Sequence, residues 1–136
     1  MKQVHVAVGV VVVNGQDVLI ARRPDDKHQG GLWEFPGGKV EPGEDVVSAL
    51  IRELDEEVAL KVRPETVSQL MQIPFSYPDK SVLLDVLYVE SDVNDALLAH
   101  GAEGQEVRWV NYTRLDEFEF PEANKAIILA LTERLS

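Results

Sequence analysis

The chain has 136 residues, 45% of them apolar, and a formal net charge of −11 from 24 acidic and 13 basic side chains. This length suits one domain with its own hydrophobic core, and we expect residues 1–136 to form it. The acidic excess argues against a nucleic-acid polymer as partner, because binding its phosphates requires basic side chains. The absence of cysteine excludes disulfides and thiolate zinc sites, and it favours a cytoplasmic location.

The start of the chain is typical of a buried β-hairpin. Residues 4–13 are apolar almost throughout, Asn14-Gly15 signals a tight turn, and residues 18–21 are apolar again. The pattern predicts a hairpin whose first strand is covered on both faces. The first apolar run is too short to cross a membrane and no small-residue cleavage site follows it, so we expect neither membrane association nor a signal peptide.

A helix is predicted in the first half of the chain. Residues 33–35 form a short candidate strand, and the glycines after Pro36 require the backbone to turn. Asp45 is a suitable N-cap, and apolar residues recur at helical spacing up to about Val58. We therefore expect a loop followed by an amphipathic helix.

The second half of the chain predicts mainly strands. Residues 62–73 and 81–90 are strand candidates joined by the turn-rich residues 74–80. Residues 94–105 are expected to form a loop with room for one helical turn, and residues 107–110 a short strand. Pro121 is suited to the first turn of a last helix. Strands mixed with helices in this way imply an α/β (α+β) sandwich.

Glutamates cluster on one arc of the predicted helix. Glu53, Glu56 and Glu57 recur at spacings of three and four, so their side chains share one side of it. Like charges at these spacings disfavour a helix by roughly 0.2–0.5 kcal/mol per pair, and no lysine interrupts the arc. The arc is either a solvated acidic face or a site for a hard divalent ion with a carboxylate left to activate water. Arg52, at its edge, could fix the rotamers of neighbouring carboxylates.

The complete segment from Gly38 to Leu60 favours the metal site. It resembles the Nudix box, G-x5-E-x7-R-E-U-x-E-E-x-G-U, where U is a bulky aliphatic residue. Ala59 departs from it by replacing the late glycine, which costs on the order of 1 kcal/mol if the backbone is left-handed there. The resemblance implies the Nudix fold, an α/β/α sandwich with a mixed sheet and a catalytic loop–helix–loop. The residues in register are Gly38, Glu44, Arg52, Glu53, Leu54, Glu56, Glu57 and Leu60.

Outside the box, the chain resembles the MutT branch of the Nudix family nearly from end to end. The resemblance implies hydrolysis of 8-oxo-dGTP to 8-oxo-dGMP and pyrophosphate by a metal-activated water, which cleanses the nucleotide pool and avoids mutation. It implies Mg²⁺ as cofactor, with Mn²⁺ as a substitute, a small-molecule nucleotide as partner, and a monomer. The matching segments are residues 7–10, 21–24, 33–39, 77–80, 103–105 and 120–124.

The same resemblance implies roles for individual residues in catalysis. Glu53 is the favoured general base, although Glu103 is an alternative proton acceptor, and Arg52 and Glu44 complete the catalytic set. The implied metal ligands are Glu53, Glu56, Glu57, Glu103 and a backbone carbonyl of Gly37 or Gly38.

The resemblance also implies substrate contacts. Asn124 is expected to read the oxidised base, because an amide matches its N7–H donor and O6 acceptor; capping of the last helix is the alternative. Phe35 packs either on the base or in the core, and Asp79 contacts the base or only shapes its turn. The implied substrate-binding residues are Arg23 and Lys39 at the phosphates, with His28, Phe35, Asp79 and Asn124.

Two other functions stay open at this point. Residues 33–35 and 38–41 also resemble Nudix pyrophosphohydrolases that prefer CTP, dCTP or another nucleoside diphosphate derivative. A non-catalytic nucleotide-binding module is the third alternative, but such modules usually lose box carboxylates, which this chain retains. Residues 120–124 favour 8-oxo-dGTP.

Overall fold

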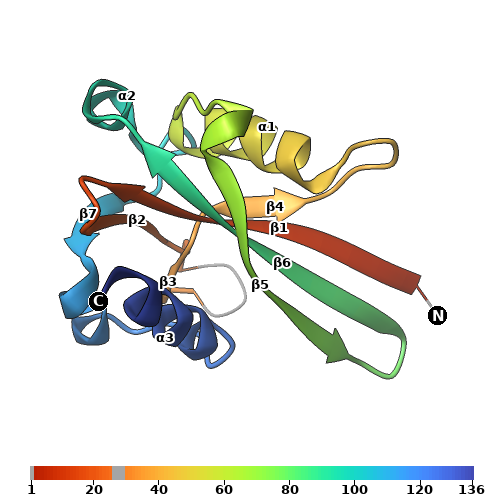
Figure 1. Ribbon diagram of the computed structural model, residues 1–136. Helices are drawn as coiled ribbons and strands as arrows, with labels where there is room; N and C mark the ends of the chain where they lie inside the picture. The colour runs from red at the N-terminus through yellow and green to blue at the C-terminus, as the bar shows by residue number, and fades with distance from the viewer. Residues whose placement is uncertain (1, 26–29) are drawn as a thin grey trace.

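The computed structural model describes residues 2–25 and 30–136. A mixed sheet lies between helix α1 on one face and helix α3 on the other, which confirms the predicted α/β/α sandwich (Figure 1). Within the described residues, no helix is long and apolar enough to cross a bilayer. The elements are β1 (Lys2–Val13), β2 (Asp17–Arg22), β3 (Trp33–Glu34), β4 (Gly37–Lys39), α1 (Val46–Val58), a 3-10 turn (Pro64–Thr66), β5 (Val67–Ser76), β6 (Lys80–Ser91), α2 (Val93–Leu98), β7 (Val107–Asn111), a second 3-10 turn (Tyr112–Glu117) and α3 (Asn124–Leu135).

Strand β1 is central to the sheet. It pairs in parallel with β6 along its whole length and antiparallel with β2 and β4. The order is β3-β2-β1-β6-β5, with β4 paired to β1 and β7 to β2. The predicted hairpin of β1 and β2 is confirmed, and its turn residues Asn14 and Gly15 have φ values of 57° and 65°. Both values suit the left-handed turn that matches strand twist.

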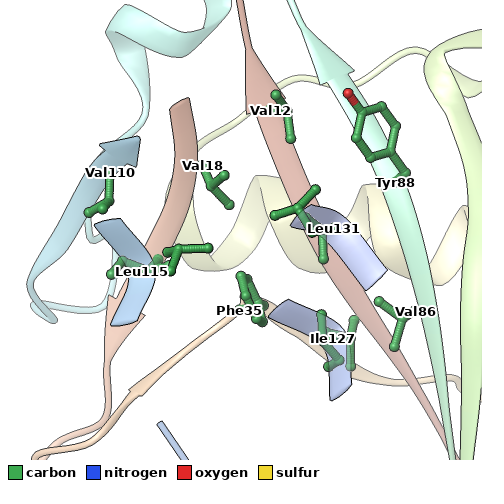
Figure 2. Packing of buried hydrophobic residues seen from close by; sticks show 12 residues of the cluster. Val12, Val18, Phe35, Val86, Tyr88, Val110, Leu115, Ile127 and Leu131 are labelled. Atoms are coloured by element: carbon green, nitrogen blue, oxygen red, sulfur yellow. The ribbon is translucent and has the colours of Figure 1, made fainter. Parts of the chain in front are cut away.

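Each face of the sheet carries its own hydrophobic cluster. Alternate β1 residues, such as Val10 and Val12, pack on the α3 side with Ile127 and Leu131 (Figure 2). The intervening Val11 packs on the α1 side with Leu50 and other buried residues. Because β1 is covered on both faces, its sequence is an almost unbroken apolar run.

Helix α1 follows the predicted pattern closely. Asp45 is its N-cap and accepts a 2.8 Å hydrogen bond from the Ser48 backbone N–H. Leu50 and Leu54 are fully buried against the sheet. Ala59 ends the helix in the left-handed conformation, with φ 54° and ψ 36°, so the departure from the Nudix motif falls where glycine is favoured.

Two predictions about the later elements need correction. Strand β5 continues to Ser76, although residues 74–80 were expected to be a turn; Pro74 is tolerated because β5 is at the edge of the sheet. The helical turn for which residues 94–105 left room forms as the short helix α2, which Asp92 caps. Helix α3 begins at Asn124 rather than Pro121, since Asn124 N–H first closes a 2.9 Å turn onto the Pro121 carbonyl.

Candidate active site

Strand β4 brings a pair of glycines against α1. A Cβ atom at Gly38 would collide with the Glu53 carboxylate, and one at Gly37 would collide with the backbone of Ala7 in β1. Glycine is therefore required at position 37 by the backbone of β1, and at position 38 it leaves room for the Glu53 carboxylate. The backbone of β4 lies directly beside the acidic arc of α1.

Arg52 is the centre of an ion-pair network around this arc. Its guanidinium makes a two-point contact with Glu44, Nε to Oε2 at 2.8 Å and Nη2 to Oε1 at 2.9 Å. Nη1 donates to Glu53 at 2.9 Å and approaches Glu56 at 3.5 Å. Nη2 also donates to the Lys39 carbonyl at 3.2 Å, which connects the helix to the loop. The planar guanidinium thus fixes several oxygen atoms relative to one another.

The two central partners of this network, Glu44 and Arg52, both stay charged near neutral pH. Hydrogen bonds from Arg52, with a smaller contribution from the Glu41 backbone, lower the pKa of Glu44 to about 2. Hydrogen bonds to Glu44 and Glu53 hold the pKa of Arg52 above its usual range. A pair that stays charged cannot exchange protons with a substrate, so its geometry suits positioning rather than proton transfer.

Glu57 is in a different environment on the same helix. Its Oε2 accepts a 3.3 Å hydrogen bond from Gly37 N–H. Burial, with the negative charges of Glu34, Glu103 and Glu53, raises the pKa of Glu57 to about 8, against the lowering effect of the Gly37 hydrogen bond. Carboxylates are therefore crowded around Glu57, and a bound cation would relieve that repulsion.

The predicted metal ligands are near one another but do not form a coordination shell. Within residues 2–25 and 30–136, no group of three or more His, Asp or Glu side chains is arranged to hold an ion. The oxygen atoms of the predicted α1 ligands point to other partners, because Arg52 binds Glu53 and Glu56 while Glu57 accepts from Gly37 N–H. The donor set, carboxylates beside glycine carbonyls, nevertheless has the all-oxygen chemistry that suits a hard divalent ion.

A cleft of about 390 Å³ adjoins this acidic region. It lies between the start of α3, the β5–β6 hairpin and strands β1 and β4. Gly37 lines the end of the cleft next to the acidic arc of α1, and Asn124 lies in the wall formed by α3. Its polar lining also includes Arg23 and Glu34, and its apolar lining includes Val6, Val8, Phe35, Phe75, Tyr77, Val82, Leu84 and Ile127.

Asn124 and Phe35 take positions that suit base recognition. Helix α3 starts without a side-chain cap, so the alternative that Asn124 serves only as a cap is wrong. Phe35 is 4% exposed and stacks on Phe120, with centroids 5.3 Å apart and planes 22° apart. Because Phe35 also lines the cleft, its core role and its predicted contact with the base are compatible.

The other predicted substrate contacts are more scattered. Arg23 lines the cleft and pairs with Glu34 at 2.9 Å. Lys39 is exposed, and it is its carbonyl that contacts Arg52. Asp79 is exposed at the tip of the β5–β6 hairpin and is not part of the cleft lining. His28 lies outside the described residues.

Glu34 is a member of the site that sequence reasoning missed. It is half-buried, lines the cleft, pairs with Arg23 and adds to the negative field at Glu57. Burial raises the pKa of Glu34, and the Arg23 charge opposes that shift. An acidic residue between Trp33 and Phe35, directly before the paired glycines, was the available signal.

Comparison with known proteins identifies relatives along the full chain. The NUDIX domain model matches residues 3–131. The 8-oxo-dGTP diphosphatase of Escherichia coli K12 is 34% identical over 131 residues, covering 96% of this chain and 98% of that protein. A solved MutT structure, from work on Aliivibrio salmonicida and Vibrio cholerae, has a TM-score of 0.82 and 34% identity, covering 98% of this chain and 99% of that one. The CTP pyrophosphohydrolase of E. coli K12 is 46% identical over 61 residues, 45% of this chain and 44% of that protein.

Proposed function

This chain belongs to the Nudix family and is a hydrolase, and from that premise we propose that it converts 8-oxo-dGTP to 8-oxo-dGMP and pyrophosphate. The observation that carries the proposal is the cleft. It is lined by Gly37, beside the acidic arc of α1, and by Asn124, at the start of α3. A nucleotide in this cleft would have its base at Asn124 and its phosphates at the acidic end. Such an activity removes an oxidised precursor before it is incorporated into DNA.

Nudix hydrolases depend on a divalent metal ion, and we propose Mg²⁺ for this chain, with Mn²⁺ as a substitute. Glu53, Glu56, Glu57 and Glu103, with a carbonyl of Gly37 or Gly38, would hold it. The ion would supply charge neutralisation at the phosphates and an activated water. The negative charges of Glu34, Glu103 and Glu53 around Glu57 support this assignment, because several carboxylate oxygens are the ligands that a hard divalent cation prefers.

The residues around the ligands have distinct proposed tasks. Arg52, itself bound by Glu44, holds the Glu53 carboxylate beside Gly38, and this position supports Glu53 as the proposed proton acceptor for the attacking water, with Glu103 as the alternative. Arg23 lines the cleft and pairs with Glu34, and its charge would contact the phosphate chain. Contacts from Lys39, Asp79 and His28 stay predictions.

Asn124 is proposed to distinguish the oxidised base from guanine. Oxidation turns N7 from an acceptor into a donor, and an amide can pair with both N7–H and O6. An unpaired polar group in the cleft would disfavour ordinary guanine by about 10²-fold or more. Asn124→Ala should therefore erase discrimination while retaining much of the turnover. Asn94→Ala, an exposed asparagine on α2, is the matched control.

The deciding experiment compares kcat/KM for 8-oxo-dGTP, dGTP, dCTP, CTP and ADP-ribose in Mg²⁺, with the products identified. A preference for 8-oxo-dGTP of about 10²-fold or more, with monophosphate and pyrophosphate as products, would support the proposal. Equal or better turnover of CTP or dCTP would move the function to a pyrimidine nucleotide. Glu53→Gln should nearly abolish turnover, and full activity in that variant would overturn the assigned chemistry.

A further inference from the structure

The loop after α2 returns to the carboxyl end of α1. The Ala102 backbone N–H donates to the Glu57 carbonyl at 3.0 Å, and the His100 N–H donates to the Val58 carbonyl at 2.9 Å. These carbonyls belong to the last turn of a helix, where no further helical N–H can reach them. The loop therefore continues the hydrogen bonding of α1 and carries Glu103 towards Glu57.

The side chain of Gln105 ties this loop to the helix a second time. Its Nε2 donates to the Glu57 carbonyl at 2.9 Å, and its Oε1 accepts from the Glu103 backbone N–H at 3.0 Å. The Gln105 amide therefore bonds to the backbones of two acidic residues of the proposed metal site, Glu57 through its nitrogen and Glu103 through its oxygen. Gly101 packs closely against the Gln105 backbone, because a Cβ atom at position 101 would collide with the Gln105 carbonyl.

Glu103 depends on this backbone contact for its place. Its side chain is exposed, and Gly104, with φ 86°, follows it directly. A short exposed loop that contains glycine has low resistance to local opening. The Gln105 side chain bonds to the Glu103 backbone and to the end of α1, so it restrains the segment that carries the Glu103 carboxylate close to Glu57.

We propose that Gln105 is a positioning residue that clamps Glu103 to Glu57, so that both carboxylates serve the same metal site. This inference rests on the proposed role of Glu103 in the function above. Groups that orient metal ligands typically change metal affinity or activity about 10–100-fold when they are removed. We expect removal of the Gln105 clamp to lower metal affinity about 10-fold and activity about 10-fold.

The test uses Gln105→Met, which keeps most of the side-chain length but removes both hydrogen bonds. Gln105→Glu keeps the acceptor for Glu103 N–H and loses the donor to the Glu57 carbonyl, so it should recover part of the loss. His100→Ala is the control, because its exposed side chain makes a local hydrogen bond with the Leu98 carbonyl, at 2.9 Å, and its backbone bond to Val58 remains. The control should match the wild type.

A metal-only readout separates the clamp from the choice of substrate. Binding of Mn²⁺, followed by electron paramagnetic resonance of the free ion, should weaken about 10-fold in Gln105→Met and be unchanged in the control. In the metal-free protein, the Glu103 amide proton should exchange faster with solvent in Gln105→Met, while the core of β1 keeps its protection. Unchanged exchange together with unchanged Mn²⁺ affinity would overturn the proposal.

A double-mutant comparison tests whether Gln105 acts through Glu103. With Glu103→Gln already present, Gln105→Met should add less than about two-fold to the loss of kcat, because the carboxylate it positions is gone. A full additional loss would assign Gln105 a structural role instead and refute the clamp. If the wild type fails to hydrolyse 8-oxo-dGTP, the proposed function is wrong, and the Mn²⁺ and exchange results still decide the clamp.

Discussion

Replacing Glu57 by glutamine tests whether carboxylate crowding strains the metal-free site. In the native protein, burial and the nearby acidic residues raise the pKa of Glu57 from 4.5 to about 8. Glutamine has nearly the same shape, can still accept the hydrogen bond from Gly37 N–H, and carries no charge. Without metal and above neutral pH, Glu57→Gln should therefore be more stable than the wild type.

The sign of this effect follows from proton linkage. Between pH 4.5 and about 8, the unfolded chain has released the Glu57 proton while the folded chain retains it. The folded state binds more protons in this window, so the stability of the wild type falls as pH rises, by up to ~1.4 kcal/mol per pH unit. Summed over this pH window and without screening, the loss of unfolding free energy approaches ~5 kcal/mol. Solvent screening at this partly exposed site reduces the expected stability difference between Glu57→Gln and the wild type to ~2 kcal/mol. That corresponds to a Tm difference of roughly 5–10 °C.

Chemical denaturation in the presence of a chelator, at about pH 5 and about pH 8.5, measures the effect. The stability gain of Glu57→Gln should appear at the higher pH and nearly vanish at the lower one. Glu56→Gln is the matched control, because Glu56 is on the same helix and its side chain is 59% exposed. Added Mg²⁺ should stabilise the wild type at the higher pH more than the variant. A gain of the same size at both pH values, or a loss at the higher one, would refute the reasoning.

Three further substitutions test the structure around the box. Ala59→Gly should stabilise the protein by about 1 kcal/mol in urea unfolding, because glycine adopts the left-handed helix end without strain; a destabilised variant would contradict this. Gly38→Ala should lower kcat by about 10²-fold or more at unchanged KM, since the added Cβ displaces the Glu53 carboxylate, and near-normal turnover would show that Glu53 can move without loss. Arg52→Lys retains the charge but not the two-point contact with Glu44, so kcat should fall about 10-fold while circular dichroism stays unchanged; equal activity would mean that the forked geometry is unimportant.

Predictions based on short-range patterns were the most accurate. The β1–β2 hairpin and the stop of α1 at Ala59 were both expected from adjacent residues. Residues on one helix have known relative positions, so the spacing of Glu53, Glu56 and Glu57 was enough to predict a shared acidic arc. The same logic anticipated that Arg52 would bind neighbouring carboxylates.

Sequence reasoning failed where the partner lies on another element. Asp85 shows this: it is 4% exposed in an apolar strand, and Gln69, Gln72 and His5 from the two adjacent strands satisfy its oxygens. The strand pairing that joins them also extends β5 through Pro74, against the local turn signal. Neither outcome can be predicted from local sequence, because the register of strand pairing determines which side chains meet.

For the site, the sequence was enough to predict the type of chemistry, because the carboxylates of α1 and the glycines before it are encoded within one continuous segment. The tertiary structure was needed to show that Glu34 pairs with Arg23, that Gln105 joins Glu103 to α1, and that Asn124 lines a cleft at the start of α3. These contacts cross large distances along the chain, and they exist because the sheet and its loops bring separate segments together. A local pattern specifies which groups are available, and only packing specifies which of them meet.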